Sequence, residues 1–99
     1  MSKEIEALVV LENLKIQKKE LFEEYIKKEG FESVGNEPFV YRGFSTTPIF
    51  NTKAYIFETF SKAFEKVGVF TCKLVCQIGE NPPEVYLYEK DGEFFKEMI

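Results

Sequence analysis

Residues 69–78 read VFTCKLVCQI, and the alternation in this stretch decides the fold class. One face of the segment is apolar throughout and consists of Phe70, Cys72, Leu74, Cys76 and Ile78. The other face is mixed and consists of Val69, Thr71, Lys73, Val75 and Gln77. A period of two residues predicts a half-buried strand whose apolar face lies on the core.

The residues that follow predict two further strands. A loop over 79–83 (GENPP) leads into 84–90 (EVYLYEK), which has a strand-like pattern. The dipeptide Asp91-Gly92 is a strong signal for a tight hairpin turn. Residues 93–98 (EFFKEM) then return as a strand or form a terminal helical turn. This part of the chain therefore predicts a three-stranded antiparallel meander.

The middle of the chain predicts one strand followed by an amphipathic helix. Residues 39–45 (FVYRGFS) have a strand-like composition, and Thr47-Pro48 is a typical helix start, with Asn51-Thr52 as a second possible one. Four apolar residues then recur with helical spacing on one face, and Gly68 follows as a stop. They are Phe57, Phe60, Phe64 and Val67.

The segment 3–29 is rich in good helix formers and ends at Gly30, which predicts a long N-terminal helix. The first part of this helix would be apolar on all sides, so it would be buried on two sides. A second subunit of a homodimer would provide that burial. The alternative is that 5–11 (IEALVVL) form a strand and the helix begins near Asn13. We favour the helix.

Together these elements predict one α+β domain over residues 1–99. In it, the long N-terminal helix and the second amphipathic helix pack on a small antiparallel sheet. That sheet consists of the C-terminal three-stranded meander plus one earlier strand. A chain of this length buries enough surface to fold without disulfides or metals.

The charge balance limits the partners. The net charge of −4 argues against direct nucleic-acid binding through a basic patch, and against an anionic membrane surface. The longest apolar run, residues 7–11, is too short for a signal peptide or a membrane span. We therefore expect a cytoplasmic protein.

The residues needed for common catalytic and metal sites are missing. The chain has no histidine and two cysteines, which excludes histidine-based triads and leaves a structural zinc site without enough ligands. Cys72 and Cys76 would lie about 13 Å apart on one strand face, too far for a disulfide. We expect both to be buried core residues, and we expect no enzyme activity and no cofactor.

One turn has the residue types of an anion site. Ser45, Thr46 and Thr47 stand between a strand and a helix start, where free backbone N–H groups are available, and Arg42 lies in the adjacent strand. The spacing is not that of a P-loop. The simpler interpretation is that these hydroxyls cap the helix, and it is favoured.

Two groups of residues are candidates for contact with a protein partner. Tyr86 and Tyr88 share one side of their predicted strand, and tyrosines are common in binding surfaces. They would otherwise form part of the core. Glu20, Glu23 and Glu24 form an acidic group that would dock on a basic groove, although nearby lysines weaken its field.

The chain resembles the small proteins, about a hundred residues long, of filamentous and rod-shaped viruses of hyperthermophilic archaea. The likeness lies in 28 Lys and Glu residues, the absence of His and Trp, and segments such as FETFSKAFEKVGVF (57–70) and EVYLYEKDGEFF (84–95). It implies a thermostable, often dimeric protein of the host cell cytoplasm, and some small acidic members of that group are anti-CRISPR inhibitors. An AT-rich genome would explain the same composition.

These observations favour a non-enzymatic protein–protein interaction module that forms a homodimer. We expect it to be a viral accessory protein that binds a host defence protein. One alternative is a small anion- or ligand-binding domain that uses the Ser45–Thr47 turn. The other is a structural protein of a virion or assembly.

Overall fold

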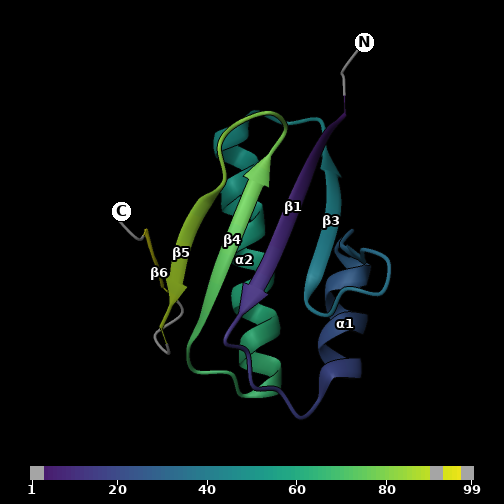
Figure 1. The fold of residues 1–99 in the computed structure, drawn as a ribbon, viewed down its shortest axis with the longest axis vertical. Helices are drawn as coiled ribbons and strands as arrows, with labels where there is room; N and C mark the ends of the chain where they lie inside the picture. Colours follow the sequence, from purple (N-terminus) through teal and green to yellow (C-terminus); the bar gives the residue numbers. More distant parts are fainter. Residues whose placement is uncertain (1–3, 90–92, 97–99) are drawn as a thin grey trace.

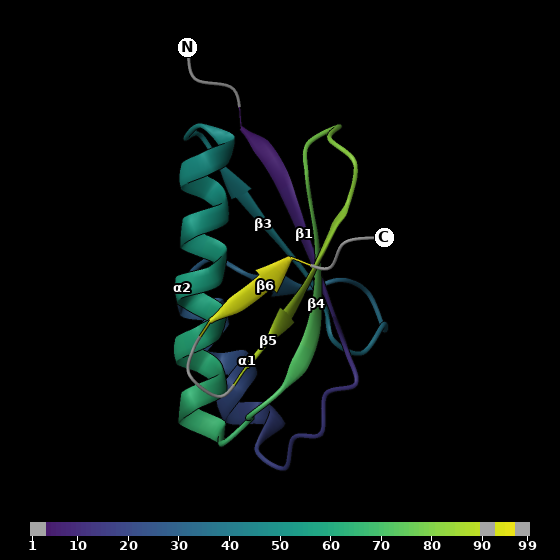
Figure 2. The same ribbon diagram turned by 90° about the vertical axis from the view of Figure 1, so that its left-hand side faces the viewer.

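The computed structural model, which describes residues 4–89 and 93–96, has two layers (Figure 1). One layer is a six-stranded antiparallel sheet and the other consists of two helices, both on the same side of the sheet (Figure 2). In chain order the elements are β1 (Ile5–Glu12), α1 (Lys19–Lys28), β2 (Glu32–Ser33), β3 (Val40–Ser45), α2 (Ile49–Val67), β4 (Cys72–Ile78), β5 (Glu84–Tyr88) and β6 (Phe94–Lys96). Across the sheet the strand order is β2-β3-β1-β4-β5-β6.

The predicted long N-terminal helix is wrong. Residues 5–12 form β1, an inner strand paired with β3 on one side and β4 on the other, and the first helix begins only at Lys19. The segment is apolar on both sides because its odd-numbered residues face the helices and its even-numbered ones, Leu8 and Val10, face the opposite side of the sheet. A central strand thus produces the all-round apolar pattern that was interpreted as a helix. The alternative of a strand over 5–11 was the right one.

The predicted sheet was too small. The strands β4, β5 and β6 are consecutive antiparallel neighbours, but β6 is short and three further strands, β1, β2 and β3, complete the sheet. The predicted strand over 39–45 is present as β3. The Asp91-Gly92 turn lies outside the described residues, but β5 and β6 on either side of it are paired.

The second predicted helix is confirmed as α2. It begins at Ile49, with Pro48 at the position before the first helical residue. Gly68 ends it with a φ of 72°, a left-handed conformation that glycine adopts without steric cost. The predicted Thr47 cap does not occur, because no side-chain hydrogen bond caps this helix.

The core lies between the two layers and is largely aromatic. Phe22 of α1 stacks on Phe64 of α2, and Phe60 packs edge-on against Phe31. From the sheet, Tyr41 and Tyr88 enter the same cluster and are almost fully buried. Burying side chains of this size contributes about 1.5–3 kcal/mol each, so this cluster supplies much of the stability.

The predicted core face of β4 is confirmed for most of its residues. Cys72, Leu74, Cys76 and Ile78 are buried, and both thiols are free. Phe70 differs, since the strand begins only at Cys72 and the phenylalanine side chain before it is 68% exposed. Burial raises the pKa of Cys72 to about 12 and, together with the nearby Glu84 carboxylate, that of Cys76 to about 11.

Candidate functional site

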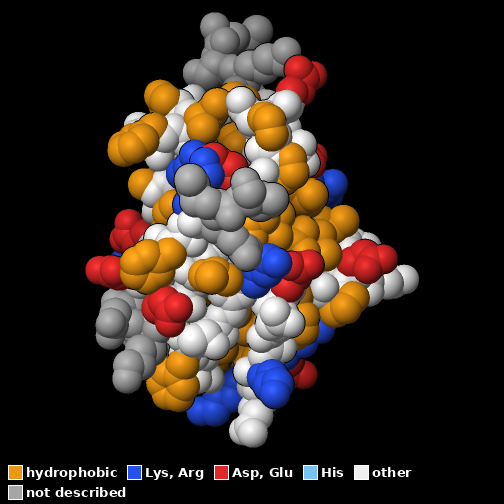
Figure 3. Space-filling model, turned by 60° about the vertical axis from the view of Figure 1, so that its left-hand side comes forward, with side chains coloured by type: hydrophobic (Ala, Val, Ile, Leu, Met, Phe, Trp, Pro, Cys, Tyr) orange, Lys and Arg blue, Asp and Glu red, His pale blue; other side chains and the backbone are white. Residues whose placement is uncertain are grey.

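The side of the sheet opposite the helices is an open apolar face, which we define by the outward residues of its strands. Neither described helix lies on this side (Figure 2). Hydrophobic side chains gather here between a few charged ones, as seen toward the right of Figure 3. The apolar residues of the open face are Leu8, Val10, Val40, Phe44, Val75, Val85, Leu87 and Phe95. Phe44, Phe95 and Leu87 are 58%, 51% and 39% exposed.

The register of the strands places four valines in one row across the open face. Val10 pairs with Val40 on one side and with Val75 on the other, and Val75 pairs with Val85. Directly paired residues of neighbouring strands point to the same side of a sheet. The four side chains therefore form a continuous apolar band that spans β3, β1, β4 and β5.

Charged residues of both signs border this valine row. Glu12 and Lys73 are cross-strand partners, and the Lys73 ammonium lies 3.8 Å from the Glu12 carboxylate. On the other side of the row, the Arg42 guanidinium lies 5.9 Å from the centre of the Phe44 ring. Glu32 of β2 is paired with Arg42 across the strands. The open face thus has an apolar centre and a mixed-charge rim.

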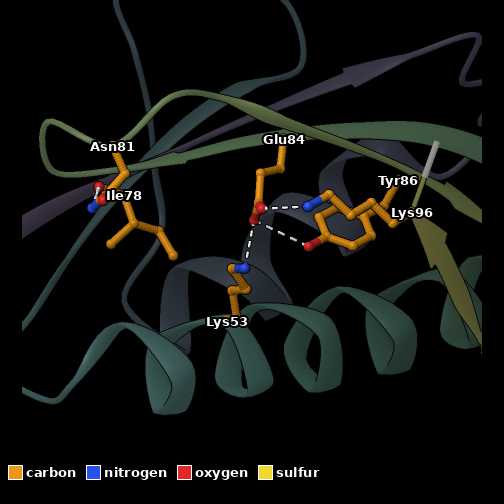
Figure 4. A network of polar contacts seen from close by, with 6 residues as sticks. All are labelled: Lys53, Ile78, Asn81, Glu84, Tyr86 and Lys96. Atoms are coloured by element: carbon orange, nitrogen blue, oxygen red, sulfur yellow. Dashed lines mark hydrogen bonds and ion pairs between the residues drawn. The ribbon is translucent and has the colours of Figure 1, made fainter. Parts of the chain in front are cut away.

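A second candidate site is a polar network where α2 meets the β5–β6 edge (Figure 4). The Glu84 carboxylate accepts a hydrogen bond from Lys96 at 2.9 Å and one from the Tyr86 hydroxyl at 3.1 Å. Lys53 of α2 forms an ion pair with the same carboxylate. The lysine hydrogen bonds, that of Lys53 first, lower the pKa of Glu84 to about 2. The carboxylate is therefore ionised at neutral pH and links helix, β5 and β6.

This network borders a cavity of about 440 Å³. Apolar walls come from Ile49, Ile78 and the prolines of the β4–β5 loop, which is closed by a hydrogen bond from the Asn81 side chain to the Ile78 carbonyl. Two ammonium groups share one carboxylate here, so the polar end carries one net positive charge. Such a cavity suits a small monoanion better than a cation.

The structure does not bring Arg42 together with the Ser45–Thr47 turn. The Ser45, Thr47 and Thr52 hydroxyls bond to one another at 2.8–3.1 Å, and they border a cavity of about 390 Å³. The lining of that cavity includes Thr46 but does not include Arg42, which points to the opposite side of β3. The hydroxyls are therefore engaged with one another and lack the predicted cation.

Tyr86 and Tyr88, predicted as partner contacts, lie on the helix-facing side of β5 and are 7% and 1% exposed. They form part of the core, which was the other interpretation of their pattern. Their neighbours Val85 and Leu87 face the open side instead. The residue type suggested that the two tyrosines were exposed, but the alternation along the strand does not show which of its faces the helices cover.

The acidic group of α1 is only partly available to a partner. Glu20 and Glu24 are exposed, but Glu23 accepts a hydrogen bond of 2.7 Å from the buried Tyr41 hydroxyl. Burial, and then this bond, raise the pKa of Tyr41. Glu23 therefore anchors α1 to the sheet, and the three carboxylates do not form one free surface.

The open face was not predicted from the sequence as a site, although two signals for it were present. The mixed face of 69–78 already contained Val75, and the segment 5–11 was apolar on both sides. Neither signal shows by itself that these apolar residues face away from the helices. That becomes clear only once β1 is known to be a central strand. The Lys53–Glu84–Lys96 network had no sequence signal, because its members come from three separate elements.

The described residues hold no group of three or more His, Cys, Asp or Glu side chains that could bind a metal ion. Neither described helix combines the length and apolar character that crossing a bilayer requires. Comparisons with protein-family models, with curated proteins and with solved structures found no match for this chain. The open face is thus the feature on which a function is argued.

Proposed function

We propose that this protein is a non-enzymatic protein–protein interaction module that forms a homodimer through the open face of its sheet. The observation that carries the proposal is the apolar centre of that face, where the valine row lies beside the exposed Leu87 and Phe95. Monomeric proteins rarely expose contiguous apolar patches larger than a few hundred Å². A face of this kind is typical of a surface that a partner covers.

The size of the face supports a stable contact. Six strands about 4.8 Å apart span roughly 24 Å, and six residues of a strand span about 20 Å, which is roughly 480 Å² in projection. The relief of the side chains raises the accessible area toward the ~800 Å² per partner of a standard protein interface. Covering this area removes the exposed aromatic and aliphatic side chains from water.

The charges favour a second copy as the partner. The whole chain carries a net charge of −4, but its open face has basic Arg42 and Lys73 close to acidic Glu12 and Glu32. Because Glu12 and Glu32 lie beside these cations, two copies can approach through this part of the face with little repulsion. A strongly acidic or basic partner would find no complementary field here.

The test is the oligomeric state of Val75→Glu, which places a charge in the valine row. Sedimentation equilibrium at about 50 µM should give a dimer for the wild type and a monomer for the variant, because an unpaired carboxylate in an apolar interface is costly. The matched control is Leu21→Glu, which adds the same charge to an exposed leucine of α1 and should leave the dimer intact.

Leu87→Glu is a second variant for the same test, and far-UV circular dichroism checks that each variant is folded. A wild-type protein that is monomeric up to about 500 µM would overturn the proposal. So would a folded Val75→Glu variant that stays dimeric.

The other functions predicted from the sequence have less support. The anion-binding alternative loses its cation, because Arg42 lies on the opposite side of β3 from the Ser45 hydroxyl. A structural role in a virion or assembly would require oligomers larger than a dimer, which the same sedimentation experiment detects. The role of a thermostable viral accessory protein that binds a host protein stays a prediction.

A further inference from the structure

We infer that two copies of this chain pack face to face about a two-fold axis that runs parallel to the strands, above the boundary between β1 and β4. In this arrangement Glu12 of each copy lies opposite Lys73 of the partner subunit. The inference rests on the proposed function, because it specifies how a second copy occupies the open face. It follows from the strand order, the register and the charges.

The strand order determines where the axis gives the largest overlap. With the order β2-β3-β1-β4-β5-β6, three strands lie on each side of the boundary between β1 and β4. A two-fold axis there places β1 over the partner's β4, β3 over the partner's β5 and β2 over the partner's β6. Any parallel axis that is displaced to one side leaves an edge of each open face uncovered.

The register shows that the apolar centre matches itself under this rotation. Val40, Val10, Val75 and Val85 lie at one level across four strands. The rotation places Val10 opposite Val75 of the partner subunit and Val40 opposite Val85 of the partner subunit. The apolar row therefore packs on the same row of the second copy.

The charges match in the same arrangement. Glu12 and Lys73 are direct cross-strand partners, with the ammonium 3.8 Å from the carboxylate. The rotation places Glu12 opposite Lys73 of the partner subunit, and Lys73 opposite Glu12 of the partner subunit. The four side chains then form one cluster of charges with alternating sign. Packed sheets cross at about 30°, so matching is best close to the axis, and these pairs lie on the two strands next to it.

The competing two-fold axis runs across the strands, along the valine row. It also superposes valines, but it places Leu8 opposite Glu12 of the partner subunit and Gln77 opposite Lys73 of the partner subunit. A carboxylate would then face a leucine inside the interface, and burial of a charge without a partner is unfavourable. The charge pattern therefore favours the axis parallel to the strands.

The experiment is a charge reversal in trans. The Glu12→Lys and Lys73→Glu variants, each studied alone, place four like charges in the cluster, and we expect the dimer dissociation constant to rise by about 10-fold or more. In an equal mixture, position 12 of each chain faces an opposite charge at position 73 of the other. We expect a heterodimer whose dissociation constant is within about 3-fold of the wild-type value.

The control pair is Glu24→Lys with Lys28→Glu on the exposed side of α1, which changes the net charge of each chain by the same amount. This pair should show no weakening alone and no preference for the heterodimer. The double variant Glu12→Lys/Lys73→Glu is a further check, since it should dimerise like the wild type even if a single variant is poorly folded.

The outcomes separate the two proposals. Heterodimer recovery at positions 12 and 73 supports the axis. If the wild type and both single variants dimerise equally well, the orientation is wrong and the proposed interaction module stands. If the wild type does not dimerise at any accessible concentration, the proposed function fails, and the inference fails with it.

Discussion

Replacing Glu84 by Gln tests the network that joins α2 to the C-terminal strands. The substitution keeps the shape of the side chain and removes its charge, so Lys53 and Lys96 lose their shared anion. We expect the free energy of unfolding at pH 7 to fall by about 1–2 kcal/mol. For a domain of this size that corresponds to a decrease in melting temperature of roughly 4–16 °C.

The magnitude follows from the exposure of the partners. The Lys96 side chain is 55% exposed, so its pair with Glu84 belongs at the low end of the range of about 0.2–1 kcal/mol for exposed ion pairs. Lys53 and Glu84 are 30% and 24% exposed, which places their pair near the upper end of that range. The Tyr86 hydroxyl can still donate to the amide oxygen of the glutamine, so this bond is not counted in the loss.

The effect has a defined pH dependence. The pKa of Glu84 is lowered to about 2 in the folded state, so its contribution is present above the ordinary pKa of about 4.5 and is lost as the pH falls toward 2. The stabilities of the wild type and the variant should therefore converge over this interval. The assay is urea unfolding followed by far-UV circular dichroism between pH 2 and pH 7.

Glu58→Gln is the matched control, because Glu58 pairs with Lys62 at 2.9 Å on the exposed side of α2. It should change the stability by less than about 0.5 kcal/mol. Equal effects of the two substitutions, or a Glu84→Gln effect that does not depend on pH, would refute the reasoning.

Two further predictions concern the core. Cys72 and Cys76 should react with a thiol reagent at pH 8 only as fast as the protein unfolds, because both are buried and burial raises the pKa of each. Rapid labelling of the native protein would contradict this. Phe60→Ala should lower the free energy of unfolding by about 3–5 kcal/mol, because Phe60 is fully buried. Phe50→Ala, at a site 81% exposed, should change it by less than about 0.5 kcal/mol. Similar losses for the two variants in urea titrations would show that Phe60 does not lie in the core.

Elements whose pattern depends on their own residues were predictable. The alternation over 69–78 identified β4, and the spacing of Phe60 and Phe64 with Gly68 after them identified α2. In both cases one face is apolar and the other is mixed, so the period of the pattern is visible without knowledge of the neighbours. Local patterning was sufficient here.

The N-terminal segment was not predictable in this way. A central strand that is apolar on both sides shows no period of two. This strand also ends in good helix formers, Leu11 and Glu12, so its composition does not exclude a helix. What decides for the strand is pairing with Val40 and Val75, which lie far away in the sequence. Propensity was overridden by tertiary pairing.

The candidate site shared this limit. Arg42 and Ser45 are three positions apart, but alternation along β3 sends their side chains to opposite sides of the sheet. Lys53 and Glu84 are far apart, yet they meet between α2 and β5. Proximity in sequence was therefore a poor guide to proximity in space. Neighbouring residues of a strand point to opposite sides of the sheet, whereas residues from a helix and a strand that are distant in sequence meet where the two layers pack.

The central place of β1 has a consequence for the order of folding. One of its two neighbours, β4, belongs to the last third of the chain, so the six strands cannot join until residues 72–78 have been made and have returned to the N-terminal segment. During synthesis, β1 waits with one unpaired edge while α1, β3 and α2 emerge. Closing so long a loop costs entropy before the contacts form, and this slows folding. Of all the strand pairs, β1–β4 therefore joins the two segments that lie furthest apart along the chain.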